Sequence, residues 1–155
     1  MTAAAGTLVI GFGNPARYDD ALGCAFGEAV ERLGRADVTV RTAYQLALED
    51  AVDIAHHEVV VFADAARSGS APFAVHAVRP RWHPSFTSHA LAPEDLLAVS
   101  QQLFGAAPTA YMYAIRGYRF DGIGEGLSPQ ARRNLESAIS FFARQLTAQA
   151  SAVPG

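Results

Sequence analysis

The chain has 155 residues, a length typical of one domain with a substantial buried core. Half of its residues are hydrophobic and only 17% are charged, which excludes a disordered or solvating segment. The 12 basic residues are all arginines and are outnumbered by 15 acidic ones, so the formal net charge is -3. This balance argues against a nucleic-acid partner, and the lack of lysine excludes P-loop and Schiff-base chemistry.

Features tied to cellular location are few. Cys24 is the single cysteine, so neither an internal disulfide nor a thiolate-rich metal site is expected. Residues 1–6 lack the basic and apolar pattern of a signal peptide. No apolar run approaches the ~18 residues that a membrane span needs. We therefore expect a cytoplasmic protein with no membrane association.

The first half of the chain alternates short apolar runs with segments of helical periodicity. Thr7–Gly11 is a buried run that predicts a strand. Apolar residues then recur at helical spacing until Gly34 ends the pattern. The run ending at Asp64 is the clearest buried strand. In order, we expect a strand at 7–11, a helix at 22–33, a strand at 38–42, a helix at 46–54 and a strand at 58–63.

The second half continues this alternation with one exception. No helix separates Asp64 from the next expected strand, so an antiparallel pair or an edge strand is expected there. Ser128–Pro129 is a cap followed by proline at the first helical position. The expected elements are a strand at 73–78, a helix at 93–103, a strand at 109–115 and a long helix from 129 to about 146, with 146–155 fraying. Together these predict a single α/β domain, spanning 1–155, with a mostly parallel sheet.

Three polar groups are expected beyond the carboxyl ends of strands, where such sheets bind ligands. The turn Gly11–Pro15 leads from the first strand to the pair Asp19–Asp20. Asp64 follows the central strand, and His89 precedes a helix. Two carboxylates and one imidazole from separate loops can converge on nickel, zinc or another borderline divalent cation.

Each of these residues also has a purely structural interpretation. An acidic pair at a helix start commonly caps the helix, and an Asp after a strand is often a turn former. A lone loop histidine is more often a surface residue than a ligand. The Gly-x-Gly turn has no third glycine, so no dinucleotide-binding fingerprint is complete.

Taken together, the motifs resemble the hydrogenase maturation endopeptidases, which remove a C-terminal extension from the large subunit of nickel–iron hydrogenases. The resemblance covers most of the chain from about Leu8 to Leu146. Its parts are Ile10–Gly23, with a Gly-x-Gly-Asn turn and an acidic pair; Val61–Ala65, a strand followed by Asp; Ser88–His89 before a helix; and Gly122–Pro129, a helix entry.

This resemblance implies a five-stranded sheet with helices on both faces. It also implies that Asp20, Asp64 and His89 bind the nickel of the large-subunit precursor, which is then both partner and source of the metal. A metal held there could polarise the scissile carbonyl or activate water. No separate catalytic residue is identified.

Two loops are expected to contact the substrate. Gly11, Gly13 and Asn14 lie in the first loop, and Gln45 lies in the loop after the second strand. That second loop, 42–49, lacks the Asp-Gly-Gly run of many family members, so it does not define which hydrogenase is processed.

Two alternatives remain open at the sequence level. Peptidyl-tRNA hydrolases share the Gly-x-Gly-Asn-Pro start, but their catalytic histidine has no counterpart in the continuation Tyr18–Gly23. A non-catalytic escort that binds the precursor is the other.

Cys24 lies in the first turns of an expected helix, where the dipole could lower its pKa, but no catalytic pattern surrounds it.

Overall fold

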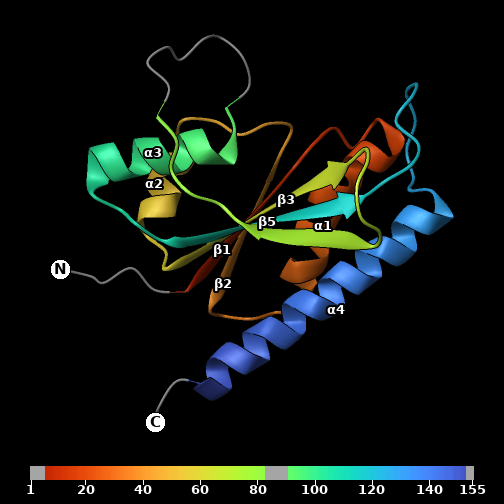
Figure 1. Ribbon diagram of the computed structural model, residues 1–155. Coiled ribbons are helices and arrows are strands. Elements are labelled where there is room, and N and C mark those ends of the chain that lie inside the picture. The colour runs from red at the N-terminus through yellow and green to blue at the C-terminus, as the bar shows by residue number, and fades with distance from the viewer. Residues whose placement is uncertain (1–5, 83–90, 153–155) are drawn as a thin grey trace.

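The computed structural model describes residues 6–82 and 91–152. Within them the chain forms a five-stranded sheet with helices on both faces, as expected (Figure 1). The strands are β1 (Thr7–Phe12), β2 (Val38–Ala43), β3 (Val59–Ala66), β4 (Phe73–Ala77) and β5 (Thr109–Arg116). The helices are α1 (Leu22–Arg32), α2 (Asp50–Ala55), α3 (Pro93–Phe104) and α4 (Pro129–Ala152), with a short 3-10 helix η1 (Tyr18–Ala21) before α1.

The sheet is parallel except at one edge. Its strand order is β2-β1-β3-β5-β4, and only β4 runs antiparallel, alongside β5. The chain leaves β1 toward β2 on one side and returns to β3 on the other. Where connections depart in opposite directions, such sheets bind ligands outside the carboxyl ends of the two strands. We call this position, at the carboxyl ends of β1 and β3, the crevice.

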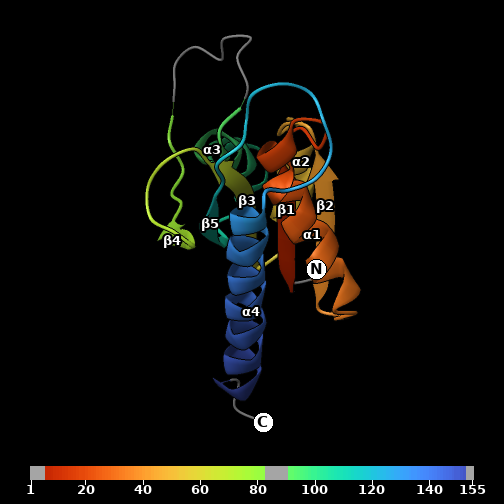
Figure 2. The same ribbon diagram turned by 90° about the vertical axis from the view of Figure 1, so that its right-hand side faces the viewer.

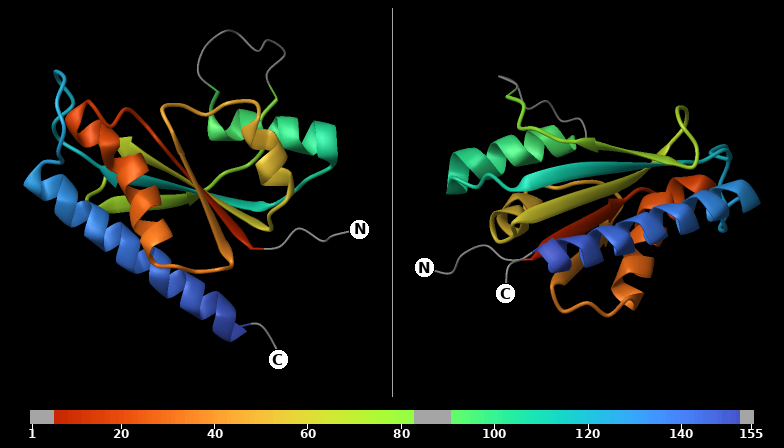
Figure 3. Two further views of the ribbon diagram at one scale, coloured as in Figure 1. Left: turned by 180° about the vertical axis from the view of Figure 1, so that it is seen from behind. Right: turned by 60° about the horizontal axis from the view of Figure 1, so that its bottom comes forward.

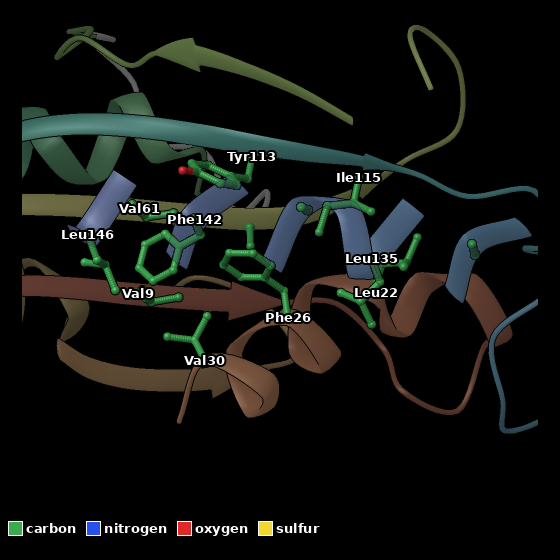
Figure 4. Packing of buried hydrophobic residues seen from close by; sticks show 13 residues of the cluster. Val9, Leu22, Phe26, Val30, Val61, Tyr113, Ile115, Leu135, Phe142 and Leu146 are labelled. Atoms are coloured by element: carbon green, nitrogen blue, oxygen red, sulfur yellow. The ribbon is translucent and has the colours of Figure 1, made fainter. Parts of the chain in front are cut away.

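Alternation along the strands divides the core between the two faces. On β1, Val9 faces α1 and α4, whereas Leu8 and Ile10 face α2 and α3. The right-hand panel of Figure 3 shows α3 on one side of the strands and α1 with α4 on the other, and Figure 2 views α4 beside α1. In the first cluster, Phe26 contacts Tyr113 and Phe142 through tilted and edge-on rings (Figure 4).

Two glycines let α1 approach the sheet closely. A Cβ at Gly23 would overlap the carbonyl oxygens of Phe12 and Ala63, and a Cβ at Gly11 would overlap the carbonyl of Gly23. A side chain at either position would push α1 away from β1 and β3. The start of α1 and η1 before it are thereby fixed next to the crevice.

Three element boundaries differ from the sequence expectation by more than one residue. The second helix begins at Asp50 rather than near residue 46, because the carboxylate of Asp50 accepts a hydrogen bond from Ala47 and holds the preceding residues in a turn. β3 continues to Ala66 because its pairing with β5 continues that far. α4 runs to Ala152, past the expected fraying point, and Leu146 is buried in the core. None of the described helices is long and apolar enough to cross a membrane.

Candidate functional site at the carboxyl ends of β1 and β3

Two carboxylates meet at the crevice between β1 and β3. Asp64 lies within β3, paired with Ala114, and not after the strand as the sequence suggested. Asp20 lies in η1, which follows the first loop. The Asp20 carboxylate is close enough to act electrostatically on Asp64 and to raise its pKa. The structure therefore brings together two of the three residues expected to bind a metal.

The first loop holds Asp20 in place. The backbone N–H of Asn14 donates to Asp20 Oδ2 at 2.8 Å, and the Asn14 side chain accepts from the N–H of Ala16 at 2.9 Å. Asn14 therefore shapes the turn with both its backbone and its side chain. Asp20 does not cap α1, whose N-cap is Ala21 and has no side-chain hydrogen bond.

Gly13 lies between the two carboxylate residues. Its φ of +142° is one that residues with a side chain rarely adopt. A Cβ at this position would overlap the carbonyl oxygen of Asp20 and lie 3.7 Å from Asp64 Oδ1. The expected close approach of the backbone at this loop is thus observed at Gly13, where it permits Asp20 and Asp64 to converge.

The electrostatics of the pair favour a bound cation. Burial raises the pKa of Asp64 to about 6, and repulsion from Asp20 adds to this. A hydrogen bond of 2.8 Å from the N–H of Ala65 offsets only part of the effect. A divalent cation between the carboxylates would remove their repulsion and place a positive charge beside Asp64. The oxygen donor set therefore fits a divalent metal.

The third expected ligand, His89, lies outside the described residues. Across residues 6–82 and 91–152, no group of three or more His, Cys, Asp or Glu side chains forms a complete metal site. Asp20 and Asp64 are thus the part of the expected ligand set that the structure describes.

Asp19, the first residue of the acidic pair, has a different role from Asp20. Its carboxylate is fully buried and accepts hydrogen bonds from the backbone N–H groups of Tyr118, Arg119 and Ser128, and from the Ser128 hydroxyl. Burial raises the pKa of Asp19, but the bonds from Arg119 and Ser128 outweigh it, so the pKa lies below its ordinary value. Asp19 fixes the loop after β5 against the first loop, a role that sequence reasoning missed.

The remaining expected contact residues lie in different surroundings. Gln45 is exposed in the loop between β2 and α2, at the carboxyl end of the sheet, where Asp64 also lies. Gly11 is buried against α1, and its place in the structure is explained by packing.

Cys24 has none of the features of a nucleophile. It is buried, and its Sγ lies 3.6 Å from the carbonyl oxygens of both Gly13 and Ala43. Burial raises the pKa of the thiol, and nearby carboxylates raise it further. The expectation that the helix dipole lowers this pKa is therefore wrong, and the thiol stays protonated at neutral pH.

Comparisons with known proteins define the class of fold. No protein-family model matches the sequence, and no curated protein matches it. Several solved structures do match. The fold is that of the nickel–iron hydrogenase maturation proteases.

One such structure is the maturation protease HycI of Thermococcus kodakarensis, with 21% identity, a TM-score of 0.71 and coverage of 92% of this chain and 93% of that one. Another is the maturating endopeptidase HybD of E. coli, with 22% identity, a TM-score of 0.70 and coverage of 93% of both chains. A third is the hydrogenase 2 maturation peptidase of a Thaumarchaeota archaeon, with 18% identity, a TM-score of 0.68 and coverage of 92% and 98%.

Proposed function

We propose that this protein is an endopeptidase that removes the C-terminal extension of a nickel-loaded nickel–iron hydrogenase large-subunit precursor. The observation that carries the proposal is the convergence of Asp20 and Asp64 at the β1–β3 crevice. It occurs in a fold shared with maturation proteases over about nine-tenths of the chain, 92% in the case of HycI.

In this proposal the nickel ion arrives with the precursor as part of the substrate. Asp20 and Asp64 contribute carboxylate oxygens to it, and His89 is the third proposed ligand. Two carboxylates form a hard and open donor set, so the free protein should bind nickel weakly. When bound, such a metal can polarise a carbonyl or activate a water molecule. The protein's own residues bind and orient: Asn14 holds Asp20, and Gly13 admits the close approach of Asp64.

The proposal makes cleavage a check on metal insertion. A precursor without nickel offers nothing for the carboxylates to bind, so it should dock poorly. Gly11, Gly13, Asn14 and Gln45 remain proposed contacts for the segment around the cleavage site. Gln45 is the best placed of these to contact a substrate, because it is exposed at the same end of the sheet as the carboxylate pair.

The decisive experiment uses one precursor in nickel-loaded and nickel-free forms. Intact mass spectrometry should show shortening of the loaded form only, and Asp20→Asn should abolish it. Asp37→Asn is the matched control, since Asp37 pairs with Arg35 on the surface. Equal cleavage of both forms would refute the role of nickel. Tight binding of the loaded precursor without shortening would instead identify a non-catalytic escort.

A further inference from the structure

Three arginines lie at the carboxyl end of the sheet, on the side of β5. This is the same end of the sheet as Asp64. Arg67 directly follows β3, Arg116 is the last residue of β5, and Arg119 lies in the loop after it. Arg116 is paired with Ala66 across the two strands, and the N–H of Gly117 donates to the carbonyl of Ala66. The three positions are therefore brought together by the end of the β3–β5 ladder. We call these residues the arginine edge.

Each guanidinium of the arginine edge lies over an aromatic ring. The Cζ atom of Arg67 is 4.4 Å from the ring centroid of Phe120, and that of Arg116 is 4.9 Å from Tyr118. The Cζ atom of Arg119 is 3.6 Å from the ring centroid of Tyr18. Stacking restricts the guanidinium plane, so less conformational entropy is lost when its N–H groups bind a ligand.

None of these three charges has a carboxylate partner in the described part of the chain. The ion pairs found there involve Arg35, Arg41 and Arg81. Asp121 and Glu125 are on the same loop as Arg119 but take part in none of these pairs. Arg67 and Arg119 are exposed, whereas Arg116 is half-buried and donates to the carbonyls of Gly69 and Gly117.

We propose that the arginine edge docks an acidic segment of the protein substrate. Charge complementarity supports this assignment, because the chain carries a net charge of -3 and yet presents these cations at the same end of the sheet as Asp64. The carboxyl end of the sheet thus has an acidic part, Asp20 and Asp64, that binds a cation. It also has a basic part, the arginine edge, that binds carboxylates. A substrate with a metal centre and an acidic segment would bind in one orientation only.

The covered faces of the aromatic rings favour a peptide over a nucleic acid as the ligand of the arginine edge. One face of each ring in this cluster is covered by an arginine of the protein itself. These rings therefore offer less stacking surface for bases than a nucleic-acid platform requires. The guanidinium fork matches the carboxylate of Asp or Glu side chains in a bidentate manner.

The inference about the peptide rests on the proposed function, and binding can be measured apart from cleavage. The probe is a fluorescein-labelled peptide of alternating glutamate and serine, titrated with the full chain and followed by anisotropy. Arg67→Glu/Arg119→Glu should weaken binding at least about tenfold. Arg32→Glu/Arg144→Glu changes the net charge equally on distant exposed helix positions and should leave binding within about twofold. Equal weakening by both double variants would overturn the proposal.

Two further arms separate the occupants and the functions. Labelled single-stranded DNA of matched charge should bind more weakly than the peptide, and tighter binding would overturn the choice of a peptide. With the nickel-loaded precursor, Arg67→Glu/Arg119→Glu should raise KM and leave kcat nearly unchanged. An unchanged KM would overturn the docking proposal and leave the endopeptidase intact. Selective peptide binding without any shortening of the precursor would support docking and refute the endopeptidase.

Discussion

A side chain at position 13 would have to occupy space that the backbone of Asp20 already fills. Gly13→Ala should therefore displace Asp20 from Asp64 and abolish processing, at a cost of about 2–4 kcal/mol in the free energy of unfolding. Gly34→Ala is the control, because Gly34 also has a positive φ of +67° but a Cβ there would meet nothing within 4 Å. Cleavage assays and urea unfolding of both variants test this, and a fully active Gly13→Ala protein would contradict it.

The half-buried carboxylate of Asp64 should destabilise the free protein at neutral pH. Its folded pKa of about 6 lies above the unfolded value of about 3.9, so the native state retains the proton over this interval. Stability is therefore lost as pH rises from about 4 to above 6. Asp64→Asn keeps an acceptor for Ala65 and should be more stable by about 1–3 kcal/mol at pH 7.5, with no difference below about pH 4.

The same variant should lose processing, because an amide is a poor metal ligand compared with a carboxylate. Urea unfolding across this pH range and a cleavage assay measure the two effects on one protein. A lower stability at pH 7.5, or normal cleavage, would count against the assignment of Asp64. Gain of stability with loss of activity is the signature of a residue kept for function.

At the scale of elements, the side chain of Asp19 is the polar centre of the contact between η1 and the loop 117–128. Backbone hydrogen bonds from the N–H of Asp19 to Arg119 and from the N–H of Tyr18 to Gly124 add to this contact. Asp19→Asn removes the charge that receives the hydrogen bonds of Tyr118, Arg119 and Ser128, at an expected cost of about 2–3 kcal/mol at pH 7. Because the folded pKa of Asp19 is lowered, its contribution is complete above about pH 4 and is lost as pH falls through the folded pKa.

Hydrogen exchange distinguishes this local role from a general loss of stability. Asp19→Asn should speed amide exchange in residues 117–128 more than in α2 and α3, which lie on the opposite face. Asp37→Asn, on the surface, should change neither exchange nor stability by more than about 0.5 kcal/mol. Uniform acceleration across the whole chain would show that Asp19 supports the fold rather than this loop.

At the scale of the whole molecule, α4 closes one face of the sheet. Phe142 is 2% exposed, and its ring centroid lies 5.6 Å from that of Phe26 and 6.1 Å from that of Tyr113. Phe142→Ala should lower the free energy of unfolding by about 3–5 kcal/mol, whereas Ser140→Ala, exposed on the same helix, should change it by less than about 0.5 kcal/mol. Folded Phe142→Ala protein should still process precursor, and loss of activity at full folding would contradict this.

The order of elements is a property that the sequence determines by itself. Apolar periodicity is a local signal, so Val9 and Val61 mark their strands and Phe26 and Phe142 their helices without knowledge of the fold. The antiparallel edge at β4 also follows from the missing helix after β3. Asp20 and Asp64 could be selected as candidate metal ligands because the carboxyl ends of parallel strands lie at the same end of the sheet.

Only the tertiary structure separates Asp19 from Asp20. The two side chains are chemically identical neighbours, and no local pattern tells which of them is buried. The answer depends on Ser128, which lies 109 residues further along the chain and bonds to Asp19, whereas Asn14 bonds to Asp20. The extension of β3 to Ala66 likewise depends on its partner β5, and the arginine edge on both. These features arise from contacts between segments that are far apart in the sequence. A short stretch of sequence contains only one partner of each contact, so it cannot predict them.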